Sequence, residues 1–125
     1  MTYRAPLDEM RFTLEEVAAV EGLKATGAFP DFTSDLTAAI LEEAAKLAEN
    51  VLAPLNRVGD AEHCKLENGA VTTPTGFPAA YAQFVEGGWQ GLQFPAELGG
   101  MGLPRALGVA VPDSDGAICQ CIFRL

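Results

Sequence analysis

Residues 33–55, TSDLTAAILEEAAKLAENVLAPL, contain the longest periodic pattern in the chain and decide its fold class. The apolar side chains in this stretch recur every three or four residues, at Leu36, Ile40, Ala44, Leu47 and Val51. This spacing is typical of an amphipathic helix with one apolar face. Thr33 or Ser34 can cap the first turn through a side-chain oxygen. Pro54 should bend or end the helix, because proline has no N–H to donate. After a bend, the segment LAPLNRVGDAE could resume as helix.

Three more segments have shorter helical patterns, residues 8–20, 76–89 and 103–111. The side chains expected to face the core are Met10, Leu14, Val17 and Ala18 in the first and Phe77, Tyr81, Phe84 and Val85 in the second. Residues 21–32, between the helix predicted at 8–20 and the long helix that begins near residue 33, should form a loop. Pro104 is well placed in the first turn of the last helix, whereas Pro112 should stop it.

Asn68-Gly69 is a turn signal with short apolar segments on both sides. It predicts a short hairpin near residues 64–73, which would be marginal by itself. The strand signals are too few for a sheet core. We therefore expect an all-α fold, a small helical bundle with this one hairpin.

Composition and charge narrow the classes of function. The chain has 125 residues, 49% hydrophobic, which suits one globular domain. Its net charge is −9, and residues 1–62 hold twelve acidic against five basic side chains. Such a surface repels phosphates, so neither nucleic acid nor an anionic membrane is an expected partner. The N-terminal residues lack a signal peptide's apolar region, and three cysteines suggest free thiols, so we expect a cytoplasmic protein.

Residues 85–104, VEGGWQGLQFPAELGGMGLP, hold six of the thirteen glycines. Gly100 and Gly102 begin a dinucleotide-binding pattern, but its third glycine and the preceding strand are missing, and no phosphate-loop motif is present. We interpret these glycines as turns between helices.

The cysteines and the single histidine do not match a metal site. His63-Cys64 and Cys119-x-Cys121 provide four potential zinc ligands, but their spacing differs from the paired C-x₂₋₄-C pattern. A Cys–His nucleophile pair is also unexpected, because adjacent side chains on one element point apart. We assign no metal ligand.

The remaining candidates for chemistry also have simpler interpretations. Glu15-Glu16 and Glu42-Glu43 are pairs of acids that could act in acid–base catalysis, but both lie beside polar residues on helix faces, which favours solvated charge. Glu42 and Lys46 have the spacing of an ion pair along a helix. The aromatic residues near the glycines, Trp89, Phe84 and Phe94, could line an apolar pocket, but core packing is the more common role.

The sequence closely resembles the N-terminal domain of the acyl-CoA dehydrogenase family over about residues 1–110. The matching features are a helix ending in A-x-x-V-x-A-P (Ala48, Val51, Ala53, Pro54), the segment E-G-G-W-x-G-L (Glu86 to Leu92) and P-x-x-x-G-G-x-G-L (Pro95 to Leu103). The segments YRAPLDEMRFTLEEV and NRVGDAEHCKLENGAVTTPTGF look like the branch that includes 3-methylmercaptopropionyl-CoA dehydrogenase. In that family the N-terminal domain is a small helical bundle, and the glycine-rich stretch links helices beside the substrate cleft.

The resemblance implies an oxidoreductase that uses FAD to remove two hydrogens from an acyl-CoA, passing electrons to an electron-transferring flavoprotein. Full-length relatives are expected to be homo-oligomers. In the family, the flavin contacts and the catalytic glutamate lie mainly beyond the N-terminal domain. We therefore assign no catalytic or cofactor-binding residue to this chain, and we expect no FAD to bind it alone.

After Val111 the sequence departs from the family pattern. PDSDGAICQCIFRL replaces the helix that would line the acyl cavity. We interpret residues 1–110 as the helical domain and 111–125 as a divergent, poorly ordered tail. The chain would then be an inactive fragment from a truncated or frameshifted gene. One alternative is a stand-alone helical interaction module that completes a separately encoded partner. Another is a small helical ligand carrier that uses the region of Trp89.

Overall fold

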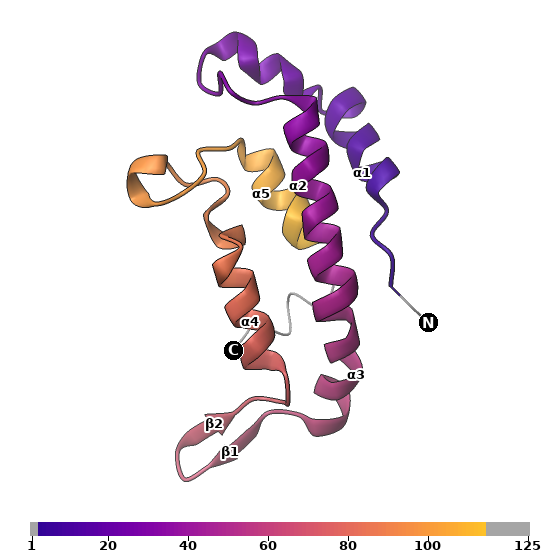
Figure 1. Ribbon diagram of the computed structural model, residues 1–125, viewed down its shortest axis with the longest axis vertical. Coiled ribbons are helices and arrows are strands. Elements are labelled where there is room, and N and C mark those ends of the chain that lie inside the picture. Colours follow the sequence, from indigo (N-terminus) through magenta and orange to yellow (C-terminus); the bar gives the residue numbers. More distant parts are fainter. Residues whose placement is uncertain (1–2, 115–125) are drawn as a thin grey trace.

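The computed structural model describes residues 3–114 and is mostly helical (Figure 1). Its elements are α1 (Leu7–Phe12), α2 (Ser34–Leu47), α3 (Ala53–Glu62), β1 (Lys65–Glu67), β2 (Ala70–Thr72), α4 (Phe77–Glu86) and α5 (Arg105–Ser114). The predicted all-α bundle with one short hairpin is confirmed. Shorter helical turns of other types connect the elements: π-helical at Thr13–Val17 and Ala48–Leu52, and 3₁₀ at Val20–Thr26, Trp89–Gly91 and Ala96–Leu98.

The segment that decided the fold class forms the long axis of the molecule (Figure 1). α2 begins after Thr33, whose side chain accepts a hydrogen bond from the N–H of Leu36 at 3.1 Å, so the predicted cap is confirmed. Pro54 does not end the helix. A π-helical turn precedes it, in which the N–H of Ala53 bonds to the carbonyl of Ala48. This wider turn accommodates the proline, and α3 continues the helix to Glu62.

The buried face of α2 is centred about one position away from the predicted stripe. Ala44 is fully buried, as expected, but the other stripe positions are only half-buried. The fully buried side chains along α2 and its π-helical turn are Thr37, Leu41, Ala44, Ala45, Ala48 and Leu52. Elements pack around more than one side of this helix. The half-buried residues of the predicted stripe therefore flank a buried face that includes three small alanines.

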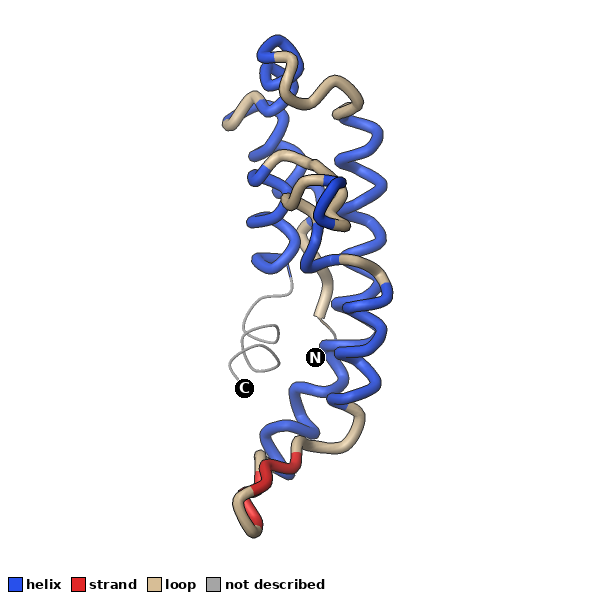
Figure 2. The backbone as a smooth tube through the Cα atoms, turned by 90° about the vertical axis from the view of Figure 1, so that its left-hand side faces the viewer, coloured by secondary structure: helices blue, strands red, loops and turns tan. Residues whose placement is uncertain are grey.

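α1 and α5 both pack against α2, and α4 stands beside the α2–α3 rod (Figures 1 and 2). Two adjoining clusters form the core. Leu14, Val20, Phe32, Leu41 and Leu107 make up the first, and Ala44, Leu92 and Val111 the second. α4 packs nearer the other end of the rod, where the Phe77 ring lies against Gly59 of α3. The segment before α1 is fixed to the rod by the N–H of Ala5, which donates to the Glu49 carboxylate at 2.9 Å.

The predicted hairpin projects from the end of the bundle, beyond α3 and α4 (Figures 1 and 2). β1 and β2 are antiparallel, with Glu67 opposite Ala70. Asn68 and Gly69 have positive φ angles of 51° and 78°, which matches the type I′ turn that Asn-Gly favours. Glycine adopts such angles without strain.

Several finer predictions were wrong. Val17, Tyr81 and Val85 are exposed rather than directed into the core. Part of the expected loop 21–32 belongs to the 3₁₀ turn Val20–Thr26, which follows a left-handed residue at Ala19. These elements are short, so a few apolar side chains at helical spacing do not establish which side is covered.

The last helix also runs further than expected. α5 continues through Pro112 to Ser114. The expected tail, 111–125, thus begins inside α5 and otherwise lies outside the described residues. Its division from 1–110 stays a prediction. Within the described part of the chain, no helix is both long and apolar enough to cross a bilayer.

Candidate functional site

The glycine-rich stretch forms a closed loop between α4 and α5, which we call the glycine loop (residues 87–104). It begins where α4 ends, and Gly88 has a left-handed φ of 70°. Backbone hydrogen bonds join its two arms. The N–H groups of Met101, Gly102 and Leu103 donate to the carbonyls of Gly91, Phe94 and Leu92 at 2.9, 2.8 and 2.9 Å. The interpretation of these glycines as turns between helices is confirmed, and the loop itself is a structured unit.

Gly100 allows the two arms to approach closely. A Cβ atom at this position would overlap the carbonyl of Phe94 and lie 2.7 Å from that residue's own Cβ. Gly108 of α5 has a similar role on the other side, where a Cβ would lie 3.0 Å from Oε1 of Gln93. These glycines therefore serve close packing of the loop.

The glycine loop presents an apolar surface to solvent. Leu92 is buried and anchors the loop in the second core cluster. By contrast, Phe94 is 51% exposed, Leu98 is 77% exposed and Met101 is about half exposed. We call these three residues the loop patch. Three large, exposed apolar side chains within eight residues of one loop make this loop a candidate for contact with another protein segment or a ligand.

The three aromatic residues near the glycines have different surroundings. Phe84 is buried, and Trp89 packs against the cluster that contains Ala44 and Val111. Core packing therefore explains these two. Phe94 is on the surface in the loop patch, so the expected role in core packing is wrong for this residue.

Three of the grooves between elements are formed entirely by described residues. The α2–α4 groove, about 460 Å³, is lined by Glu43, Lys46, Leu47, Val51, Gln83, Glu86, Gly87 and Trp89. The α3–α4 groove, about 360 Å³, is lined by Leu55, Asn56, Gly59, Asp60, His63, Cys64, Pro74 and Phe77. The α1–α5 groove, about 340 Å³, is lined by Pro6, Glu9, Met10, Thr13, Leu14, Ala106, Val109 and Ala110. Each is large enough for a small ligand. The α3–α4 groove holds both a thiol and an imidazole, from Cys64 and His63.

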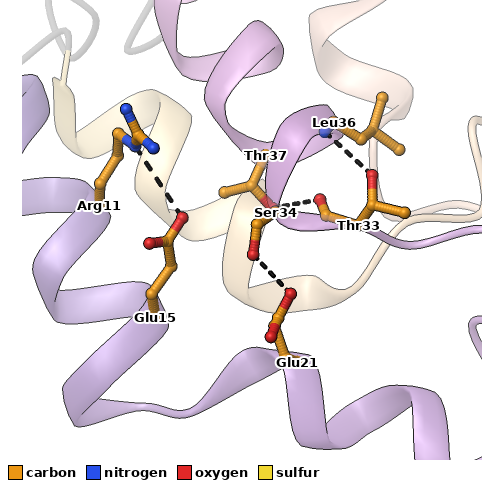
Figure 3. Close-up of polar contacts among 7 residues, drawn as sticks. All are labelled: Arg11, Glu15, Glu21, Thr33, Ser34, Leu36 and Thr37. Atoms are coloured by element: carbon orange, nitrogen blue, oxygen red, sulfur yellow. Dashed lines mark hydrogen bonds and ion pairs between the residues drawn. The ribbon is translucent and has the colours of Figure 1, made fainter.

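The paired acids lie on the surface as expected, with one exception. Glu16, Glu42 and Glu43 are exposed, whereas Glu15 is partly covered and lies 3.9 Å from Nε of Arg11 (Figure 3). Figure 3 also shows Glu21 accepting a hydrogen bond from Ser34 at the start of α2. These contacts connect neighbouring elements and leave no carboxylate pair poised for acid–base work.

Lys46 pairs with Glu43 rather than with the predicted Glu42. The hydrogen bond from Lys46 to Glu43 and the attraction between their charges raise the pKa of Lys46, and Glu42 adds a smaller effect. Both partners are well exposed, so this ion pair contributes little to stability.

Glu62 accepts a hydrogen bond from the backbone N–H of Thr75 at 2.7 Å, across the base of the hairpin. That bond is the main cause of a lowered pKa at Glu62, and the Thr75 side chain and the positive charge of Lys65 lower it further. The carboxylate connects the end of α3 to the segment that leads into α4.

His63 and Cys64 are both exposed beside the α3–α4 groove, at the junction of α3 with the hairpin. Cys119 and Cys121, the other two potential zinc ligands named from the sequence, lie outside the described residues. Among residues 3–114, no three acidic, histidine or cysteine side chains gather as metal ligands would.

Comparison with known proteins adds what the geometry alone does not. The chain is 41% identical over 113 residues to the 3-methylmercaptopropionyl-CoA dehydrogenase of Ruegeria pomeroyi, an alignment that covers 90% of this chain. It is 29% identical over 107 residues, 84% of this chain, to FadE5, the broad-specificity linear acyl-CoA dehydrogenase of Mycobacterium tuberculosis. The chain is homologous to acyl-CoA dehydrogenases. No family model matches it.

The chain spans only about a fifth of the length of these acyl-CoA dehydrogenases, 19% of the first and 18% of the second. The two alignments confirm the resemblance to acyl-CoA dehydrogenases, including the branch of 3-methylmercaptopropionyl-CoA dehydrogenase.

The sequence alone did not identify the loop patch. Its glycines marked the turns, but which apolar side chains stay exposed depends on how the loop closes.

Proposed function

We propose that residues 1–110 form the N-terminal helical domain of an FAD-dependent acyl-CoA dehydrogenase, which catalyses α,β-dehydrogenation of an acyl-CoA thioester. In this proposal the chain supplies one wall of the acyl-CoA cleft and is inactive alone. The observation that carries it is the 41% identity to the Ruegeria pomeroyi enzyme over 90% of the chain. The acyl-CoA specificity and transfer of electrons to an electron-transferring flavoprotein belong to the same proposal.

The apolar surface of the bundle supports a role as one part of a larger unit. The loop patch precedes α5 in the sequence, and Val109 of α5 is itself exposed. A wall that closes an acyl cleft or packs against another domain needs such side chains, whereas an isolated bundle gains nothing from them. The surface would be covered once the remaining parts of the enzyme are in place.

The linings of the three grooves described above support the expectation that this chain alone does not bind FAD. Its diphosphate needs basic side chains or a helix N-terminus directed at the phosphates. The three grooves are lined by a single lysine or arginine, Lys46, which is already paired with Glu43. Acidic side chains line each groove as well. We therefore derive no chemical step through a flavin on this chain.

The proposal is tested on the isolated chain first. After incubation with excess FAD and gel filtration, we expect no flavin absorbance with the protein and no dehydrogenation of an acyl-CoA with an artificial electron acceptor. Flavin retained in a one-to-one ratio would show that this chain carries a cofactor site of its own. The proposal that this chain alone is inactive and does not bind FAD would then be wrong.

The loop patch also favours a second candidate, a helical interaction module that completes a separately encoded partner. The test uses the Ruegeria pomeroyi dehydrogenase with the matching segment deleted. If the separately purified chain restores turnover when added, association between two polypeptides is sufficient. If only a covalent fusion restores turnover, the chain acts as a domain of one polypeptide.

A further inference from the structure

The hairpin has an open edge that no described element covers. All six residues of β1 and β2 are exposed, and Leu66 and Val71 are 72% and 60% exposed although they are the apolar residues of the two strands. A bare strand edge is a template for pairing with another strand.

The register of the hairpin fixes which backbone groups are available. The two-residue turn makes Glu67 and Ala70 the pair that exchanges both backbone hydrogen bonds. Pairs alternate along an antiparallel ladder, so Leu66 and Val71 form the non-bonded pair. The N–H and C=O groups of Leu66 therefore point away from β2, toward the open edge of β1.

We propose that β1 pairs with β1 of a second copy of this chain, in an antiparallel arrangement that places Leu66 opposite Leu66. This register uses the two outward groups of each Leu66 in a reciprocal pair of hydrogen bonds. It joins the two hairpins into a four-stranded sheet with strand order β2-β1-β1-β2.

The charges of β1 are self-complementary in this register. When Leu66 faces its own copy, Lys65 of each chain lies directly opposite Glu67 of the other. These two cross-strand pairs fall at non-bonded positions, where side chains approach most closely. The sequence Lys-Leu-Glu is therefore complementary in charge to a second, antiparallel copy of itself. This property points to a second copy of the chain rather than to an unrelated strand.

The apolar side chains gain from the same arrangement. Leu66 and Val71 share one face of the hairpin, because side chains alternate along a strand and these two residues are opposite each other. Pairing two copies places four apolar side chains side by side on that face. A two-stranded hairpin is marginal alone, whereas more strands with a shared apolar face stabilise one another. The strands are only three residues long, so we expect a weak and reversible dimer.

Charge reversal provides the test, using the full chain at low ionic strength and sedimentation velocity over a hundredfold range of concentration. We expect wild type to dimerise, and both Lys65→Glu and Glu67→Lys to weaken the dimer at least about five-fold, because each places like charges opposite one another. The double swap Lys65→Glu/Glu67→Lys restores both pairs and should dimerise within about two-fold of wild type.

The two single charge reversals distinguish strand pairing from general repulsion between negatively charged chains. Lys65→Glu changes the net charge from −9 to −11, whereas Glu67→Lys changes it to −7. General repulsion would make the first variant associate less and the second more. Strand pairing predicts that both associate less. A monomeric wild type, single reversals with opposite effects, or a swap that fails to recover would each overturn the proposal.

Two proline variants identify the edge. Leu66→Pro removes an N–H that points toward the open edge of β1, and Val71→Pro removes its counterpart on the outer edge of β2. We expect Leu66→Pro to abolish dimerisation and Val71→Pro to preserve it. Equal loss in both, or loss only in Val71→Pro, would show that β1 is not the pairing edge. Far-ultraviolet circular dichroism confirms that the helices are intact in every variant.

Discussion

At the scale of single residues, Gly100 shows how the glycine loop is built. The loop closes only because the backbone at Gly100 lies against the carbonyl of Phe94 with no side chain between them. We expect Gly100→Ala to lower the free energy of unfolding by about 2 kcal/mol or more, because the added methyl group forces the two arms apart. Urea denaturation followed by Trp89 fluorescence measures the change.

Gly22 provides the matched control for Gly100. A Cβ at this position would have no heavy atom within 4 Å beyond its chain neighbours, so Gly22→Ala should leave stability unchanged or raise it by up to about 1 kcal/mol. Similar losses in the two variants would show that the close approach in the glycine loop does not matter.

The capping of α2 is a second effect at this scale. Thr33 accepts a hydrogen bond from the N–H of Leu36, so Thr33→Ala should cost about 1 kcal/mol of stability. Ser34→Ala removes only an exposed side-chain contact with Glu21 and should cost less than about 0.5 kcal/mol. Thermal unfolding of both variants measures the difference, and an equal or reversed order would contradict the assignment of Thr33 as the cap.

Glu62 should make stability depend on pH. The hydrogen bond from the N–H of Thr75 holds the pKa of Glu62 below its usual 4.5. The folded state binds this proton less readily than the unfolded state does. The carboxylate therefore stabilises the fold fully above about pH 4.5, and this contribution is lost as the pH falls through the lowered pKa.

Glu62→Gln isolates this contribution. We expect the difference in urea midpoint between wild type and Glu62→Gln to be largest at neutral pH and to shrink in acid, below about pH 4.5. A difference that stays constant from neutral to acidic pH would mean that the bond to Thr75 does not stabilise the ionised carboxylate.

At the scale of elements, the sequence predicted those whose local signals are strong. The periodicity of residues 33–55, the cap at Thr33 and the Asn68-Gly69 turn each depend on the backbone preferences of a few neighbouring residues. Pro54 was harder to predict, because a π-helical turn upstream lets the helix continue past it. Val17 and Tyr81 are exposed rather than buried, and this outcome depends on where distant elements pack. A short pattern of apolar residues does not encode where distant elements pack.

The hairpin should be separable from the bundle. None of the side chains from Lys65 to Thr72 is buried or belongs to a core cluster. Replacing residues 65–72 with a short Gly-Ser linker should change the free energy of unfolding of the bundle by less than about 1 kcal/mol. Urea denaturation measures this, and a much larger loss would place the hairpin within the cooperative unit of the bundle.

At the scale of the whole molecule, the fold and the family could be predicted but the exposed surface could not. Helical periodicity and the glycine-rich motif identified an all-α bundle that resembles acyl-CoA dehydrogenases, and 41% identity to one of them confirms that relationship. The loop patch depends on long-range closure of the glycine loop. Phe94 and Leu92 are both apolar residues of the same loop, yet only Leu92 is buried.

The central claim is that this bundle serves as the helical domain of an acyl-CoA dehydrogenase. The most direct measurement replaces the matching segment of the Ruegeria pomeroyi 3-methylmercaptopropionyl-CoA dehydrogenase with the homologous residues within 1–110 of this chain, and records flavin content and acyl-CoA turnover. We predict full flavin content and turnover within about ten-fold of the unmodified enzyme, with a further loss on Gly100→Ala but not on Gly22→Ala. A folded, flavin-loaded fusion without turnover would contradict the claim.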